Sequence, residues 1–500
     1  MSEAPDRGPG VVSGLTWTLT ALVSTRLVTL IGLAVLARLL APEDFGLLAF
    51  ALAYITYVTA LGDLGTGMAL IYWPSRKSDA AQVTFAVSVV MGCLWMGATI
   101  LLAPAIAAFF ESPEGAPVLI AIAWSLPIQA LGSTHEALCR KSLRFRAWLV
   151  PELALAAGKA AVSIALALGG FGVWSLVWGH LAGHLVRTVL LWVIVPWRPT
   201  LRMPWDLIGP MFGYGRSIVA VNVLSVVVHH ADLLIIARLL GVTALGFYQM
   251  AAKIPEMSIT LLVRAVSSVL FPALSRIHAQ GRNLSETYLA TLEGVGLVTV
   301  PTAVVLVTMA EPLVLIFFGA TWIPAVPVVR ALAVVACLRA LGTHAGDLLK
   351  ACGRPGTLVV LAAVKAAVLI PTLILAGRGG MVAVGLAMAG VTAVTMTLDI
   401  AVACTYTRTS GWAVLASLRP GAAGGVAVFA GLALVDAGLP ATTPSTAVAV
   451  SLATALATYL CMVRVATPEL YGQALLYGRQ AAARMRANRS PSDLAMDDHR

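Results

Sequence analysis

Long apolar runs that recur along the whole chain constrain its fold more than any other feature of the sequence. An α-helix needs about 20 apolar residues to cross the hydrocarbon core of a bilayer. Fourteen runs meet that length, at 12–40, 45–72, 81–110, 116–138, 147–168, 171–195, 214–240, 244–272, 288–318, 324–348, 357–377, 380–404, 411–436 and 444–464. We therefore predict an all-α, polytopic membrane protein with 14 transmembrane helices.

The composition agrees with a lipid environment. Hydrophobic residues make up 59% of the 500 residues and charged residues 11%, whereas a soluble domain carries about 25% charged residues. Lysine and arginine in cytoplasmic loops explain the net charge of +10, so we expect no nucleic acid partner. The first apolar run is too long for the core of a cleaved signal peptide, and we expect it to remain as a helix.

The connecting loops alternate in charge along the chain. The basic loops carry Arg76, Lys77, Arg140, Lys141, Arg144, Arg146, Arg198, Arg202, Arg276, Arg282, Lys350, Arg354 and Arg408. The loops between them carry Glu43, Asp44, Glu111, Glu114, Asp436 and a single arginine, Arg378. Because basic loops stay on the cytoplasmic side of a membrane, we expect both termini in the cytoplasm.

An internal repeat divides the chain into two halves. The residues Ala-Arg-Leu-Leu at 37–40 and Gly46 recur as Ala-Arg-Leu-Leu at 237–240 and Gly246, which is a spacing of 200 residues. Phe-Phe recurs at 109–110 and 317–318, and Ala-Leu-Gly-Ser at 130–133 is matched by Ala-Leu-Gly-Thr at 340–343. Each half holds an even number of predicted spans, so the halves have the same orientation and form a parallel repeat.

The repeat predicts a domain layout. We expect a cytoplasmic N-terminal segment at 1–11, a six-helix bundle at 12–195, a cytoplasmic linker at 196–213, a second six-helix bundle at 214–404, two further transmembrane helices at 405–464 and a cytoplasmic tail at 465–500. Duplicated halves of this kind are common in membrane transporters, which hold their substrates between the repeats.

Catalytic motifs are absent from the sequence. It contains no GxxxxGK[ST] phosphate-binding loop, no GxSxG and no HExxH, and such motifs would be expected of the enzymes they mark. The six cysteines include no CxxC pair, and no ligand cluster suggests zinc. We therefore expect a protein that is not an enzyme and that has no cofactor and no bound metal.

Charged residues inside the predicted spans are the candidate functional residues, because charge at bilayer depth is expensive and usually faces a cavity. Arg26, Lys253 and Arg264 lie in spans that the repeat makes equivalent or adjacent. We predict that they line a cationic cavity between the bundles and bind phosphate oxygens, for which arginine offers paired donors. Internal pairing is the alternative: Lys253 could pair with Glu256 on one helix face, and Arg26 with Asp63 on the neighbouring helix.

Other embedded residues are candidates for ion coupling or gating. Asp63, Asp232 and Glu256 could carry a cation or a proton, and Arg38 and Arg238 stand at equivalent outer ends of two spans. For both arginines, snorkelling to the interface is the alternative to a gate. His229 and His230 are adjacent and point to different helix faces, so we expect them to form no single site. The remaining embedded charges include Glu152, Lys159, Glu293, Arg330, Arg339, Lys365 and Asp399.

Five stretches of the sequence resemble a known transporter family. They are ARLLAPEDFGLLAFA (37–51), LGDLGTGMALIYWPSRKSD (61–79), GGFGVWSLVWGHLAG (169–183), HHADLLIIARLLGVTALGFYQMAAKIPE (229–256) and VLFPALSRI (269–277). These stretches are similar to the polysaccharide-biosynthesis flippases, the O-antigen and exopolysaccharide transporters of the multidrug/oligosaccharidyl-lipid/polysaccharide (MOP) superfamily. The resemblance covers nearly all of the first twelve spans.

The resemblance implies a function and partners. Flippases of this kind move an undecaprenyl-diphosphate-linked oligosaccharide across the bacterial cytoplasmic membrane by alternating access of two lobes. Relatives that flip lipid-linked cell-wall precursors use cavity arginines on the first and eighth spans, where Arg26 and Arg264 stand here. The implied partners are this lipid-linked oligosaccharide and membrane lipids, together with a polysaccharide polymerase and a chain-length regulator.

Two other functions compete with this hypothesis. A cation-coupled multidrug exporter of the same superfamily would want an acidic cavity, and the embedded residues of the first, second, seventh and eighth spans lean basic. A non-transporting scaffold of a polysaccharide assembly complex would need no embedded charge, because burying charge in a bilayer is costly and is retained for function.

Overall fold

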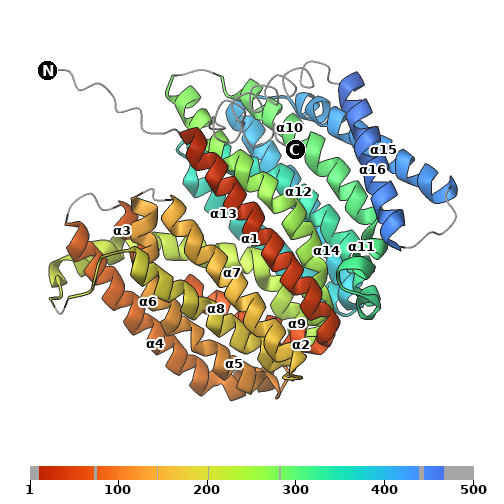
Figure 1. Cartoon of the computed structure of the whole chain (residues 1–500). Coiled ribbons are helices and arrows are strands. Elements are labelled where there is room, and N and C mark those ends of the chain that lie inside the picture. Colours follow the sequence, from red (N-terminus) through yellow and green to blue (C-terminus); the bar gives the residue numbers. More distant parts are fainter. Residues whose placement is uncertain are drawn as a thin grey trace, which may run out of the picture.

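The computed structural model describes residues 11–72, 76–142, 145–200, 202–280, 283–438 and 444–466, and every regular element in these ranges is helical (Figure 1). The all-α prediction is therefore confirmed. Most of the predicted N-terminal segment 1–11 and of the predicted tail 465–500 lies outside the described residues.

The helices of the first half are α1 (Val11–Leu39), α2 (Pro42–Ala60), α3 (Thr66–Tyr72), α4 (Lys77–Phe109), α5 (Gly115–Ala123), α6 (Ser125–Lys141), α7 (Phe145–Leu168) and α8 (Val173–Ile194). The second half contains α9 (Trp205–Ala279), α10 (Ser285–Thr308), α11 (Ala310–Phe317), the 3₁₀ helix η1 (Ala320–Ala325), α12 (Val326–Ala351), α13 (Pro355–Gly377) and α14 (Gly380–Thr407). The C-terminal helices α15 (Gly411–Gly438) and α16 (Pro444–Ala466) pack against each other beside α10.

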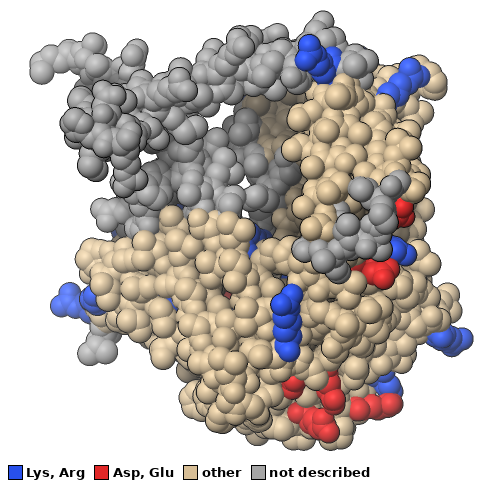
Figure 2. All heavy atoms as spheres, turned by 45° about the vertical axis from the view of Figure 1, so that its right-hand side comes forward, with Lys and Arg blue, Asp and Glu red and all other residues tan. Residues whose placement is uncertain are grey.

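The length and hydropathy of the helices fit a lipid bilayer. In the described part of the chain, ten helical stretches are long and apolar enough to cross a membrane, and the most apolar of them, Gly356–Gly377, has a mean hydropathy of 2.5. Figure 2 shows a face made mostly of uncharged residues, with acidic side chains gathered at the lower end of the molecule. The protein is therefore a multi-pass membrane protein, since such stretches are the ones that bury their backbone groups in lipid.

Three of the predicted single spans are each divided between two helices. The predicted span 45–72 divides into α2 and α3 around Leu64 and Gly65, whose φ angles are positive at 51° and 78°. The span 116–138 divides into α5 and α6, and the span 288–318 into α10 and α11. The sequence prediction treats each of these stretches as one span and does not locate the points at which the helices break.

The long helix α9 connects the two halves. It bends at Gly241, where φ is 81° and ψ is 175°, and this is where the sequence predicts a turn between two spans. Helix α9 already begins at Trp205, inside the predicted linker 196–213. The start of α9 is helical because Leu207 and Met211 are buried against α3, α4 and α6 of the first half.

A polar contact and a ring stack fix the start of α9 to the first half. Arg76 Nη1 lies 2.5 Å from Asp206 Oδ2, and Arg76 Nε lies 2.7 Å from Asp79 Oδ2. The hydrogen bond from Arg76 lowers the pKa of the Asp206 carboxyl. Tyr72 and Tyr214 stack with ring centroids 4.9 Å apart, so this end of α9 moves with the first half.

The two halves meet where α2 crosses α9 (Figure 1). A Cβ atom added at Gly46 would lie 1.8 Å from the carbonyl oxygen of Val242, and one added at Gly246 would lie 2.0 Å from the carbonyl oxygen of Pro42. Only glycine lets two backbones approach this closely. The repeat therefore places its matched glycines at the crossing point of the two halves.

Trp322 of η1 closes the same end of the molecule. Its side chain is fully buried, and its Nε1–H donates a hydrogen bond of 2.8 Å to the carbonyl oxygen of Ala37 in the first half. Its ring packs edge-on against Phe45 and Phe247, with centroids 5.3 Å and 5.7 Å away. A buried indole that satisfies its N–H across the boundary adds apolar contact area between the halves.

Candidate functional site

A cavity of about 1160 Å³ lies in the second half, between both arms of α9 and helices α12, α13 and α14. One wall comes from the first half, where Ala49, Leu52, Ala53 and Thr56 of α2 face the cavity. Most of its lining is apolar, with polar groups concentrated on α9, α12 and α14. The volume exceeds that of most small-molecule pockets, which hold about 300–1,000 Å³.

All three acidic residues that line the cavity in the described part of the chain have partners. Glu256 Oε2 lies 3.2 Å from Lys253 Nζ, and Lys365 of α13 pairs with Asp399 of α14. Asp232 is buried and accepts hydrogen bonds from the Tyr248 hydroxyl at 2.8 Å and from the backbone N–H of Leu233 at 3.0 Å. Buried carboxylates need such donors, since an unpaired one at this depth would be strongly destabilising.

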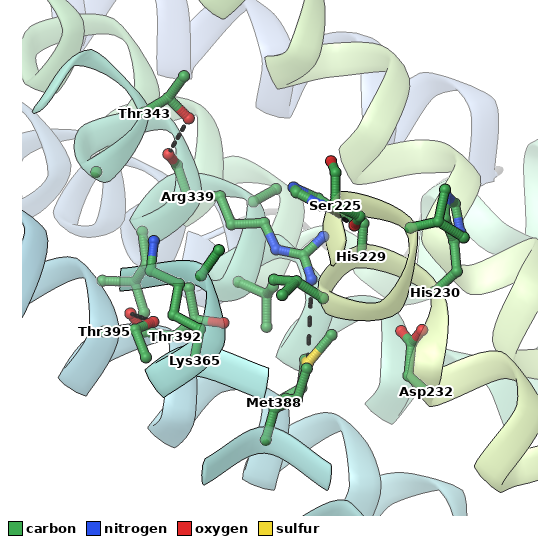
Figure 3. Close-up of a pocket in the computed structure, with 18 of the residues that line it drawn as sticks. Ser225, His229, His230, Asp232, Arg339, Thr343, Lys365, Met388, Thr392 and Thr395 are labelled. Atoms are coloured by element: carbon green, nitrogen blue, oxygen red, sulfur yellow. Dashed lines mark hydrogen bonds between the residues drawn. The ribbon is translucent and has the colours of Figure 1, made fainter. Parts of the chain in front are cut away.

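Arg339 of α12 and His229 of α9 also face the cavity (Figure 3). The Nη2 atom of Arg339 approaches the sulfur of Met388 at 4.0 Å. His229 Nδ1 lies 2.7 Å from the carbonyl oxygen of Ser225; a carbonyl oxygen only accepts, so Nδ1 carries the proton and Nε2 is left as the second ring nitrogen. His230 lines the same cavity, but its side chain lies on a different side of α9 from that of His229 (Figure 3), as the sequence predicts for adjacent residues.

Two of the predicted phosphate-binding residues, Lys253 and Arg26, have different surroundings in the structure. Lys253 lines the cavity and pairs with Glu256, which is the internal pairing given above as the alternative to phosphate binding. Arg26 is half-buried on α1 and is not among the residues lining the cavity. Arg264 lies on α9, but its side chain is outside the described part of the structure.

The predicted pair between Arg26 and Asp63 does not form among the described residues, because both carboxylate oxygens of Asp63 have local partners. Oδ1 accepts from the N–H of Gly65 at 3.0 Å, and Oδ2 accepts from the N–H of Gly67 at 2.8 Å. A short acidic side chain often binds the backbone just beyond it in this way. Asp63 therefore stabilises the start of α3.

The two repeat-related arginines contact opposite halves. Arg38 of α1 donates from Nη2 to the carbonyl oxygen of Ile316 in α11 at 2.6 Å. Arg238 of α9 lies 2.8 Å from Glu111 Oε1 and places its guanidinium 5.4 Å from the ring centre of Phe109, at the end of α4. Both contacts join the halves at the end where the glycines cross.

Charges in the first half fall into two groups. Arg187 of α8 is largely buried and lies 2.7 Å from both Glu136 and Glu152. Lys159 of α7 makes no ion pair with any described residue, and it is not among the residues lining the cavity. Sequence reasoning named Arg339, Lys365 and Asp399 only as embedded charges, and their depth in the spans was the signal that could have singled them out.

Comparisons with known proteins match this architecture. A family model described as "Polysaccharide biosynthesis protein" matches residues 35–327. The chain is 25% identical over 370 residues to the lipopolysaccharide biosynthesis protein WzxC of Escherichia coli (strain K12), covering 73% of this chain and 75% of WzxC. It is 23% identical over 323 residues to the succinoglycan biosynthesis transport protein ExoT of Rhizobium meliloti (strain 1021), covering 65% of each chain.

Solved structures share the fold. The lipid II flippase MurJ in an inward closed conformation superposes with a TM-score of 0.74 at 14% identity, over 91% of this chain and 99% of MurJ. An inward-facing multidrug resistance MATE family transporter of the MOP superfamily gives a TM-score of 0.60 at 14% identity, over 79% of this chain and 98% of that chain.

The predicted family is confirmed, because the family model matches more than half of the chain. The fold is that of polytopic transporters, and the relatives are bacterial membrane proteins. The chain belongs to the polysaccharide biosynthesis protein family.

Proposed function

We propose that this protein is a flippase that carries an undecaprenyl-diphosphate-linked oligosaccharide to the outer leaflet of the bacterial cytoplasmic membrane. The observation that carries the proposal is the cavity of about 1160 Å³, whose mostly apolar wall carries the charged residues Asp232, Lys253, Glu256, Arg339, Lys365 and Asp399. A saccharide headgroup needs a cavity of this size, whereas a polyprenyl tail can remain in the lipid. The similarity to the lipopolysaccharide biosynthesis protein WzxC, the succinoglycan biosynthesis transport protein ExoT and the lipid II flippase MurJ supports the same substrate class. The protein is a transporter rather than an enzyme.

The proposed topology has fourteen spans, in which α2 with α3, α5 with α6 and α10 with α11 each form one divided span, and α9 forms two. Spans one to six and seven to twelve form the two lobes, and α15 and α16 are added to the second lobe. Both termini then lie in the cytoplasm of the cell. The acidic side chains gathered at one end of the molecule in Figure 2 support this orientation, since acidic loops are tolerated on the outer side.

With that topology, the glycine crossing, Trp322 and both arginine contacts lie at the outer end of the lobes. The protein is then closed toward the outside, and the lobes separate there when the substrate leaves. Alternating access in transporters built from repeats is a rocking of one bundle against the other. Arg38 and Arg238 would be gating residues in this cycle.

Replacing Glu111 with glutamine is expected to weaken closure of the outer end by a small factor. The pair of Arg238 and Glu111 is partly exposed, with side-chain exposures of 38% and 72%, and pairs of this kind contribute about 0.2–1 kcal/mol. Labelling of an Ala37→Cys variant by a water-soluble maleimide, in a background without the six native cysteines, should accelerate by at most about fivefold. Glu114→Gln in the same loop is the control and should leave the labelling rate unchanged.

The substrate diphosphate is proposed to contact the basic residues at the boundary between the lobes, Arg26, Lys253 and Arg264. Two observations support this. Arg26 makes no ion pair with any described residue, and Lys253 lines the cavity. Asp232 is proposed for ion coupling, because its buried carboxylate is held by neutral donors and can be neutralised by a proton or a cation. Glu256 beside Lys253 is a second candidate.

Reconstitution into liposomes tests the function. Fluorescently labelled undecaprenyl-diphosphate-linked oligosaccharide is placed in both leaflets, and dithionite measures its exchange between them. Exchange that requires the protein is the expected result, and protein-free exchange rates would contradict the proposal. Efflux of ethidium without lipid exchange would favour the multidrug exporter. A protein that shows neither activity in liposomes, but that still restores polysaccharide output to a deletion strain, would favour a scaffold for the polymerase and the chain-length regulator.

A further inference from the structure

Arg339 has a position that its local contacts do not explain. It lies near the middle of α12 (Val326–Ala351) and extends into the cavity beside His229 (Figure 3). Within the described part of the chain, its guanidinium makes no ion pair and reaches only the sulfur of Met388, at 4.0 Å. A thioether is a weak acceptor, so the five N–H donors of this guanidinium remain almost unused.

The acidic residues around the cavity pair or hydrogen-bond with residues other than Arg339. Asp399 pairs with Lys365, Glu256 lies 3.2 Å from Lys253, and Asp232 accepts from Tyr248. None of these carboxylates lies within 4 Å of Arg339. An arginine stays charged in proteins, and a charge at bilayer depth without a partner is costly and marks a functional position.

Arg187 shows how this fold treats an arginine that only stabilises structure. It lies in the first half, and two carboxylates, those of Glu136 and Glu152, each lie 2.7 Å from its Nη2. Arg339 has no comparable arrangement, although both residues lie well within membrane-spanning helices. The difference indicates that the acceptor for Arg339 is supplied by a ligand.

The surroundings of Arg339 define that ligand. His229 keeps its Nδ1 proton on the carbonyl oxygen of Ser225 at 2.7 Å, which leaves Nε2 as an acceptor in the neutral ring. A guanidinium next to an imidazole acceptor suits an oxyanion that has a hydroxyl close to it. Phosphorylated and acidic sugars carry both groups, and guanidinium binds either oxyanion through two parallel hydrogen bonds.

We propose that Arg339 binds an oxyanion of the translocated substrate inside the second lobe, with His229 accepting a neighbouring hydroxyl. The inference rests on the proposed function, and it adds a binding residue in the cavity, whose lining does not include Arg26 of α1. The oxyanion comes either from the diphosphate of the carrier lipid or from the carboxylate of an acidic sugar.

Binding to the purified full-length protein in lipid nanodiscs tests the inference. The two probes are farnesyl diphosphate and a tetrasaccharide that contains glucuronic acid, and intrinsic tryptophan fluorescence reports binding. Arg339→Gln should weaken binding of one probe by at least about tenfold, because hydrogen bonds to charged groups are individually strong. The affinity of Arg339→Lys for that probe should lie between those of the wild type and Arg339→Gln, since lysine keeps the charge but not the paired donors.

The probes identify the source of the oxyanion. Loss confined to farnesyl diphosphate assigns Arg339 to the diphosphate, and loss confined to the tetrasaccharide assigns it to the sugar acid. Arg330→Gln is the matched control, because Arg330 lies on the same helix and is exposed. This variant should bind both probes as tightly as the wild type does. Unchanged binding of both probes by Arg339→Gln, or binding of neither probe by the wild type, would overturn the inference.

The liposome exchange assay separates this inference from the proposed function. If the wild-type protein exchanges no lipid-linked oligosaccharide, the proposed function is wrong. If the wild type and Arg339→Gln exchange it equally fast, only the role of Arg339 is wrong. Thermal unfolding of Arg339→Gln should match that of the wild type, so that lost binding is not lost folding.

Discussion

Replacing Gly246 with alanine is expected to oppose closure of the outer end and to reduce transport by about fivefold to a hundredfold. The added Cβ would lie 2.0 Å from the carbonyl oxygen of Pro42 and 2.9 Å from its carbon. These are backbone atoms of the facing helix, so no side-chain rotation relieves the clash. Overpacking of this kind costs about 1–3 kcal/mol, and here the cost falls on the closed arrangement alone.

The same clash makes the position testable in two ways. Maleimide labelling at Ala37→Cys should accelerate, because Ala37 is buried at this end of the boundary. Exchange of lipid-linked oligosaccharide should fall, because the lobes cannot return to the outward-closed state. Gly46→Ala should behave alike, since its Cβ would meet the carbonyl oxygen of Val242 at 1.8 Å.

Gly294→Ala is the matched control for both glycines. It lies in α10, where an added Cβ meets no atom within 4 Å. Alanine is a better helix former than glycine by about 1 kcal/mol, so this variant should transport normally and unfold no more easily. If Gly246→Ala closes and transports as well as Gly294→Ala does, the crossing is not part of the transport cycle.

The repeat in the sequence matched Gly46 with Gly246 and Arg38 with Arg238, but it did not predict that the two glycines cross. The structure places both glycines and both arginines at the boundary between the halves. Hydropathy counts apolar residues and is insensitive to backbone direction. It therefore missed the break at Leu64 and Gly65, whereas the bend at Gly241 falls between the predicted spans 214–240 and 244–272.

The candidate site was predictable only where residues are close in sequence. Lys253 and Glu256 are three residues apart on one helix, and their pairing followed from helix geometry. Lys365 and Asp399 lie on neighbouring helices, and the rotation of each helix about its axis decides whether they meet. The sequence does not encode that rotation in a readable pattern. Arg26 and Asp63 do not pair for a different reason: backbone N–H groups close to Asp63 in the sequence already donate to both of its carboxylate oxygens.

Replacing Asp399 with leucine is expected to lower the free energy of unfolding by about 3–5 kcal/mol, because it leaves a buried lysine without its partner. The side chains of Lys365 and Asp399 are 25% and 11% exposed, so water offers Lys365 little compensation. Thermal unfolding followed by tryptophan fluorescence in detergent should show the loss as a clearly lower midpoint. Lys350→Met is the control: its pair with Asp347 spans 3.4 Å, and the Lys350 side chain is 54% exposed, so the loss should stay below about 1 kcal/mol.

The double variant Lys365→Met/Asp399→Leu decides what the pair does. Apolar residues of similar volume often replace a buried ion pair at no cost in stability, so the double variant should unfold near the wild-type midpoint. Transport should still be impaired, because the cavity would lose two of its charged groups. Recovery of both stability and transport would reduce the pair to a structural contact. A double variant as unstable as Asp399→Leu would instead mean that packing around α13 and α14, and not the unpaired charge, caused the loss.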